Sequence, residues 1–171
     1  MITVGQSVLI LAQEGAVLAP LIASFRHVEA AHVEILQQEP GESLSAFRQR
    51  LHVLLAGIAR AGRCIEHGAF VAKSGFGLPD VLATVALLSS LVATMVPFGT
   101  GHVYLCGHEG DAQAGYALEA LADAMRDQVR GTGVEVVTDE SLALAVADAE
   151  ADGVTAAAES AGVGAAVPQP A

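Results

Sequence analysis

The stretch from Gly101 to Met125 has the residue order of an anion-binding turn. Its apolar residues VYLC are followed by the turn GHEG and then by a run of small residues typical of a helix. A strand that turns directly into a helix exposes backbone N–H groups and the positive end of the helix dipole, and both attract anions. We therefore expect either a binding site for an anion such as phosphate or a plain connection between two elements. The ionisable side chains around this turn are His102, His108, Glu109 and Asp111.

Glu29 and His32 form an ExxH pattern on a predicted helix. Di-iron bundles use this spacing to place two ligands on one helix face, but they also need a second ExxH and two further carboxylates. The next predicted helix supplies Arg48 and Arg50 rather than an inward-facing acid. We predict no metal site, and we expect His32 to be a hydrogen-bonded residue at the edge of the core.

Cys64 lies beside Glu66 and His67, which are the residue types of a Cys/His nucleophile pair. Neighbouring residues on a helix point in different directions, and no residue nearby orients the imidazole. We therefore predict no catalytic residue here and no cofactor. Cys64 and Cys106 form no CxxC pair and lie in apolar surroundings, which indicates two buried thiols in a reducing compartment. The N-terminal residues lack the basic region of a signal peptide, so we expect a cytoplasmic protein or part of an intracellularly assembled particle.

Composition favours close-packed helices. Hydrophobic residues make up 53% of the 171 residues, aromatic residues 4%, and tryptophan is absent. The formal net charge of −11 disfavours binding to nucleic acid or to an anionic membrane, because both need clustered Lys and Arg.

The charge is unevenly distributed along the chain. Between Arg48 and Lys73 there are five basic residues and one acid, Glu66, whereas acids dominate from Glu109 to Asp152. Regions of opposite sign favour head-to-tail contact between copies, so we expect a homo-oligomer or a larger assembly. Separate solvated faces of opposite sign are the alternative.

In the first hundred residues the pattern predicts mainly helices. Residues 4–12 are an apolar run that fits either a strand or a helix. A helix is predicted over residues 20–38, with Leu21, Phe25, Val28, His32 and Ile35 on one face. Ser43 is the expected N-cap of a further helix that ends near Gly62. After a loop over residues 74–80, residues 81–96 are expected to form a central helix that is buried on all sides.

The remaining residues predict a strand over 103–106, a helix over 112–129, a strand over 134–137 and a helix from Thr138 to about Glu150. Short turns between them imply a right-handed parallel unit. The expected fold is α/β and predominantly helical, with a small parallel β-α-β unit in the C-terminal half. Residues 1–153 are expected to form one domain, with 1–100 mainly helical and 101–153 strand-helix-strand-helix. Residues 154–171 are expected to be a low-complexity Ala/Gly/Pro tail.

The turn from Cys106 to Ala114 resembles that of sugar isomerase (SIS) domains, such as sedoheptulose phosphate isomerases, which read CGNGGS before an Ala-rich helix. TDES, at residues 138–141, is similar to the TDxS that begins that family's next helix. The resemblance implies that Gly107 and Gly110 shape the turn and that Ser141 lies near a sugar phosphate. A Toll/interleukin-receptor-like resemblance, through VYL and VEVVTDE, is equally partial.

Three positions differ from the SIS pattern, and two of them change its charge. Where that family has Asn, Gly and the phosphate-binding Ser, this chain has His108, Glu109 and Asp111. Carboxylates repel a phosphate, and at a helix N-terminus each contributes about 0.3–1 kcal/mol through the dipole. We therefore predict first that this junction is capped by its own side chains. The candidate ligand-binding residues are Gly107, His108, Gly110, Asp111 and Ser141.

Three functions remain open from the sequence. The first is a non-enzymatic, self-associating structural or assembly subunit of a bacterial or phage complex. The second is an SIS-like Rossmannoid module that binds a phosphorylated sugar or similar molecule, with an isomerase-like activity if it is an enzyme. The third is a short membrane-associated subunit using residues 81–96, which are fewer than the roughly 20 apolar residues that a bilayer span requires.

Overall fold

A five-stranded parallel sheet forms the centre of the computed structural model, which describes residues 7–19, 21–22, 32–99, 101–107 and 111–138. The strand order is β2-β1-β3-β4-β5, and every neighbouring pair is parallel. The strands are β1 (Ser7–Ala12), β2 (His32–Gln37), β3 (His67–Val71), β4 (Gly101–Cys106) and β5 (Val134–Thr138). This is the order of a doubly wound sheet, whose winding direction reverses between β1 and β3.

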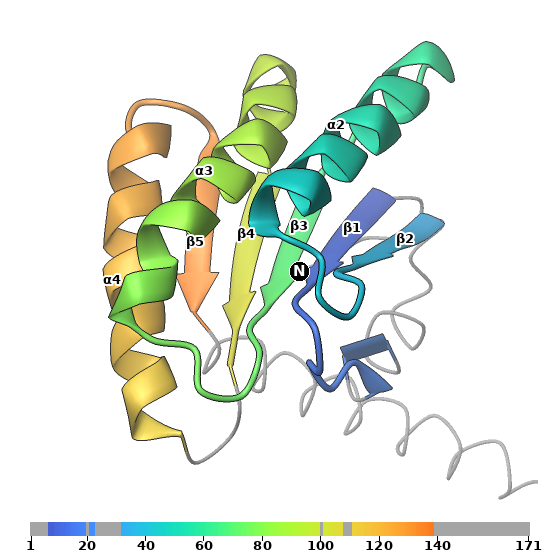
Figure 1. The fold of residues 1–171 in the computed structure, drawn as a ribbon. Coiled ribbons are helices and arrows are strands. Elements are labelled where there is room, and N and C mark those ends of the chain that lie inside the picture. Colours follow the sequence, from blue (N-terminus) through green and yellow to red (C-terminus); the bar gives the residue numbers. More distant parts are fainter. Residues whose placement is uncertain (1–6, 20, 23–31, 100, 108–110, 139–171) are drawn as a thin grey trace, which may run out of the picture.

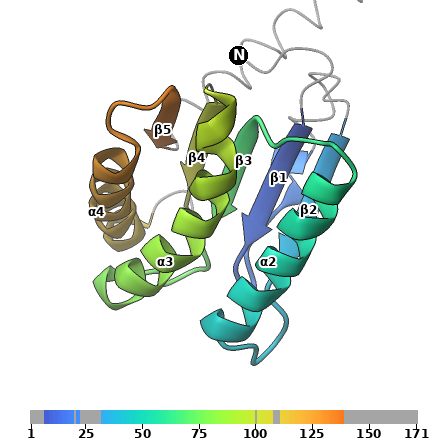
Figure 2. The ribbon, with the colours of Figure 1, turned by 90° about the horizontal axis from the view of Figure 1, so that it is seen from above.

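Three helices cover one face of this sheet (Figures 1 and 2). They are α2 (Leu44–Arg60), α3 (Leu78–Met95) and α4 (Ala112–Val129), and the short 3-10 helix η1 (Val96–Phe98) follows α3. The fold is therefore α/β with parallel β-α-β units, as the sequence predicts. The parallel sheet is larger than the expected pair of strands, because β1, β2 and β3 extend it within the first hundred residues.

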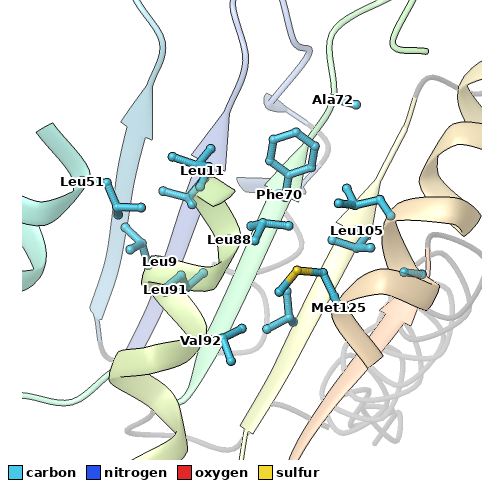
Figure 3. Close-up of a cluster of buried hydrophobic side chains, with 14 of the residues drawn as sticks. Leu9, Leu11, Leu51, Phe70, Ala72, Leu88, Leu91, Val92, Leu105 and Met125 are labelled. Carbon is cyan, nitrogen blue, oxygen red and sulfur yellow. The ribbon is translucent and has the colours of Figure 1, made fainter. Parts of the chain in front are cut away.

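The main core lies between the sheet and the three helices (Figure 3). Strand side chains that point toward the helices meet apolar side chains from each helix in turn. The contacting set includes Leu9, Leu11, Phe70 and Leu105 from the strands, and Leu51, Leu88, Leu91, Val92 and Met125 from the helices. A second apolar cluster lies on the opposite face and includes Val8, Ile10, Ala69, Val71 and Tyr104. Strands β1, β3 and β4 are thus buried on both faces, which explains their nearly continuous apolar sequences.

Helix α2 has the boundaries that its caps predict. The Ser43 hydroxyl accepts a hydrogen bond from the Ala46 N–H at 3.2 Å, and Gly62 beyond the helix has a φ of +69°. A left-handed residue at this position favours glycine. Its buried face consists of Phe47, Leu51, Leu55 and Ile58.

Helix α3 begins earlier than predicted and is not buried on all sides. It starts at Leu78, within the expected loop. Pro79 fits the first helical turn, and the Asp80 carboxylate accepts a hydrogen bond from the Gly77 N–H at the helix N-terminus. One face packs on the sheet through residues such as Leu87, Leu88 and Leu91, whereas Leu82 on the outer face is 82% exposed. The expectation of burial on all sides is therefore wrong, since α3 lies in an outer layer.

Among the described residues, one segment, Leu78–Phe98, is long and apolar enough to cross a membrane by length and composition alone. In this structure its helix α3 packs beside α2 and α4 in the layer that covers the sheet (Figure 2). The packing of its inner face on the sheet accounts for the apolar residues on that face.

The helix predicted over residues 20–38 is wrong at its C-terminal end. Residues 32–37 form β2, an edge strand, and Val33 and Ile35 pair with Val8 and Ile10 of β1. Apolar residues spaced for one helical face also fit a half-exposed strand when the run is short, and pairing with β1 decides the outcome. His32 and Ile35 are exposed here rather than on a buried face. Phe25, Val28 and the ExxH residue Glu29 lie outside the described residues.

Strand β3 lies in a stretch for which no strand was predicted from the sequence. It contains five residues, all buried, and pairs with β1 on one side and β4 on the other. The predicted elements at 103–106, 112–129 and 134–137 are confirmed as β4, α4 and β5. The helix predicted from Thr138 does not begin there, because Thr138 is the last residue of β5. The rest of that predicted helix and the tail at 154–171 lie outside the described residues.

Candidate functional site

The carboxyl edge of the sheet is the usual place for a ligand in a doubly wound fold, because loops and helix N-termini converge there. In this chain the end of β1 is tied to the end of β3. Gln13 is 2% exposed, its Oε1 accepts a hydrogen bond from the Lys73 N–H at 3.0 Å, and its own N–H donates to the Val71 carbonyl. The side chain of Gln13 thus occupies the position between the ends of β1 and β3, where the winding of the sheet reverses.

The N-terminus of α3 is also closed by the chain itself. Asp80 Oδ2 accepts a hydrogen bond from the Gly77 N–H at 3.0 Å, and Asp80 Oδ1 lies 3.5 Å from Lys73 Nζ. A carboxylate in the first turn takes the place that an anionic ligand would otherwise occupy. Lys73, a cation on this edge, is paired with that carboxylate.

The strand-to-helix turn after β4 is capped by Asp111. Its Oδ1 accepts from the Ala114 N–H at 3.0 Å, and its Oδ2 accepts from the Gly75 N–H at 3.4 Å. The predicted capping role of Asp111 is therefore confirmed, and the same carboxylate connects this turn to the loop after β3. The resemblance did not indicate this second contact, which depends on the sheet register.

Gly107 lies where α4 approaches β4. A Cβ at this position would lie 2.6 Å from Leu118 Cδ1, so the glycine permits helix packing. This contact gives Gly107 a structural role at the turn. Three other candidate ligand-binding residues, His108, Gly110 and Ser141, lie outside the described residues, as does Glu109.

Replacing Asp111 with Ala should lower the free energy of unfolding by about 1 kcal/mol, because the α4 N-terminus loses its cap. Urea unfolding followed by circular dichroism measures this. Asp123→Ala is the matched control, since Asp123 lies on the exposed face of the same helix with 78% of its side chain accessible. Equal loss in both variants would contradict the capping role.

A small hollow of about 270 Å³ lies beside β1 and β2 on this edge and is lined by Glu14, Gly15, Gln37, Gln38, Glu39 and Pro40. Its Glu14 carboxylate accepts from the Gly41 N–H at 3.2 Å. The nearby Arg50 pairs with Glu42 at 2.8 Å. The hollow therefore presents carboxylates to solvent and is unsuited to a phosphate.

A histidine-tyrosine cluster lies at the amino end of the sheet, on the face opposite the helices. The rings of His67 and His102 stack with centroids 5.3 Å apart, and Tyr104 stacks on His102 at 5.9 Å. His102 Nε2 lies 3.4 Å from Glu135 Oε2. Burial, together with the charge of His102, lowers the pKa of His67 to about 4. Burial also raises the pKa of Tyr104, with a smaller contribution from Glu135.

These positions correct two sequence interpretations. His102 is the second residue of β4, at the amino edge of the sheet, whereas Asp111 follows the end of β4 at the carboxyl edge. The two side chains therefore do not cluster. His67 begins a strand rather than lying on a helix, and Cys64 precedes it in a loop. Within the described parts of the chain, no group of three or more His, Cys, Asp or Glu side chains is arranged to hold a metal ion.

A hollow with a volume of about 510 Å³ lies between α2 and α3. Small side chains form much of its wall, and Arg48 and His52 of α2 lie at its rim. Both are hydrogen-bonded to Ser90 of α3, from Arg48 Nε at 3.1 Å and from His52 Nε2 at 2.9 Å. The lining residues are Arg48, His52, Leu55, Ala56, Ala59, Ser89, Ser90, Ala93 and Thr94. We call this hollow the α2–α3 groove.

The groove was not predicted from the sequence. Its signal is present in α2, where positions 48, 52 and 56 are spaced by four and are neighbours along one side of the helix. That side carries Arg, His and Ala, whereas the buried residues Phe47, Leu51, Leu55 and Ile58 lie elsewhere on the helix. The packing partner, however, could be identified only once α3 was placed beside α2.

Comparison with known proteins gives no family for this chain. No family model matches it, and no curated protein matches it. Among solved structures it is similar to a GDP-L-fucose synthetase from Naegleria fowleri, with 13% sequence identity and a TM-score of 0.44. The similarity covers 80% of this chain and 50% of that one, so the chain matches about half of that protein's length.

Proposed function

We propose that this chain is a non-enzymatic subunit that self-associates in a bacterial or phage protein complex. One observation carries the proposal. Of the Lys and Arg side chains that the structure describes, Arg48 and Arg60 are those without a carboxylate within 4 Å among the described residues. Both belong to α2, which contains no acidic residue.

An acidic partner for this helix is available in the chain itself. Residues 139–171 contain six acids and no base, namely Asp139, Glu140, Asp148, Glu150, Asp152 and Glu159. A surface and a segment of opposite charge on one chain favour association between copies. The closed carboxyl edge also supports a binding role rather than catalysis, because the described helix N-termini there are occupied by Ser43, Asp80 and Asp111.

Localisation in the cytoplasm, or in a particle assembled inside the cell, is part of this proposal. Its support is that the chain has only two cysteines, Cys64 and Cys106, and that they form no CxxC pair.

Sedimentation velocity over a series of protein concentrations tests self-association. We expect the weight-average sedimentation coefficient to rise with concentration, because association follows mass action. A coefficient that stays at the value of a 17.4 kDa monomer throughout would contradict the proposal.

A second candidate function is binding of a phosphorylated sugar at the turn after β4. It is supported by the resemblance of the sequence around Gly107 and by the strand-to-helix geometry of β4 and α4. The wild-type chain should then gain thermal stability with millimolar sugar phosphate, since a ligand that binds the folded state raises its stability. An unchanged melting temperature would contradict this candidate and favour the first.

A further inference from the structure

We propose that the α2–α3 groove binds the acidic segment of residues 139–152 from a second copy of this chain. This inference rests on the proposed self-association and names its surface.

The walls of the groove fit an apolar helix row. Ala56 and Ala59 of α2 face Ala93 of α3, and these small side chains leave the hollow of about 510 Å³ between the two helices. Figure 1 shows α2 and α3 side by side on the outer layer. Small residues at a helix surface let another backbone approach closely. The groove can therefore receive a segment rich in Ala, Leu and Val.

Two arginines of α2 lie near the groove. Arg48 lines it together with His52, one turn further along the helix. Arg60 is twelve residues, about three and a third turns, beyond Arg48, and it follows the lining residue Ala56 by one turn. The Arg48 Nε–H donates to Ser90, and the Arg60 Nε–H donates to the Ala56 carbonyl. These hydrogen bonds hold the Arg48 guanidinium at the groove and that of Arg60 near the backbone of Ala56, while the Nη groups of both can still donate to a carboxylate.

Residues 139–152, DESLALAVADAEAD, have the complementary pattern. Leu142 and Val146 are spaced by four, and so are Asp148 and Asp152, so on a helix each pair would share a face. Five acids in this segment have no basic neighbour within it. The segment thus supplies both the apolar row and the carboxylates that the groove lacks.

The position of β5 favours a second copy over the same chain. Thr138 ends β5 at the carboxyl edge of the sheet, on the edge strand farthest from β2. The groove lies beside residues 89–94, in the second half of α3, toward the amino edge. Helices α4 and α3 lie between them in the outer layer (Figure 1). A segment from another copy reaches the groove without crossing these helices.

Charge reversal in the full chain tests this surface. We expect R48E/R60E and, separately, D148K/D152K to weaken self-association by about tenfold or more, because each leaves like charges opposed. The control is R126E/R130E on α4, whose arginines pair with acids of their own helix and should leave association unchanged. R48Q/R60Q provides a milder variant, and circular dichroism verifies that every variant is folded.

Mixing the two reversed variants gives the decisive result. The mixture should recover association, since the lysines of one copy meet the glutamates of the other. The inference is overturned if R48E/R60E associates like the wild type, although self-association itself would then stand. If the wild type is monomeric, both this inference and the proposed self-association are overturned. Any stability lost in R48E/R60E would then come from a contact within one chain.

Discussion

Replacing Leu91 with Ala should lower the free energy of unfolding by about 3–4 kcal/mol. Leu91 lies in α3, is fully buried, and faces β3, β1 and the neighbouring core side chains (Figure 3). Removing its isobutyl group loses burial and leaves a cavity that rigid neighbours fill only in part. Chemical denaturation in urea measures the change, and an unchanged slope confirms that the midpoint reports stability.

Gly68 provides a sharper form of this prediction. A Cβ on Gly68 would lie 2.6 Å from Leu91 Cδ2, so Gly68→Ala alone should destabilise the fold by about 1–3 kcal/mol through overpacking. In the Leu91→Ala background the new methyl group enters the cavity instead. The double variant should therefore be more stable than the sum of the single changes predicts. Strict additivity would show that α3 does not pack on β3 as described.

Lowering the pH from about 6.5 to about 4 should remove about 3 kcal/mol of stability through His67. His67 is 2% exposed, and its pKa in the folded state falls from 6.5 to about 4 because burial and the His102 charge disfavour the imidazolium. The unfolded chain takes up this proton near pH 6.5, and the folded chain does so only near pH 4. The unfolded state therefore binds more protons across this window, and stability falls as the pH falls.

The variant His67→Gln isolates this contribution. Between pH 6.5 and 5 the carboxylates with ordinary pKa values remain mostly ionised, so His67 should dominate the slope, which reaches at most about 1.4 kcal/mol per pH unit. The Gln variant should show a much flatter dependence in this range. The same slope in both proteins would show that His67 does not cause it and would contradict the prediction.

The sequence predicted best those elements whose signals are local. Ser43 and Gly62 mark the ends of α2, and Asp111 marks the start of α4, because each satisfies backbone groups within a few residues. Strand β4 and strand β5 were also predicted, since each is a short apolar run between turn residues.

The missed elements depend on distant partners. The residues of β2 fit a helical face equally well, and only pairing with β1 selects a strand. Strand β3 contains Gly68 and Ala69, which are poor strand formers, and its stability comes from burial between β1 and β4. Because these strands were not predicted, the sheet was expected to be smaller than it is.

The contacts of the candidate site also divide into those that are local in the sequence and those that join distant residues. The cap at Asp111 was predicted because it lies within one turn of α4. Its contact with Gly75, the stack of His67 on His102, and the α2–α3 groove join residues that are far apart in sequence. No periodicity in a single segment reports such contacts, so they required the sheet register and the helix layer.

Self-association through opposite charges is the central claim, and light scattering of the full chain at low and high salt tests it most directly. At low ionic strength, about 20 mM, we expect a molar mass that is a multiple of 17.4 kDa. At about 1 M salt, where the Debye length falls to about 3 Å, the mass should decrease toward that of the monomer. A mass of 17.4 kDa under both conditions would contradict the claim.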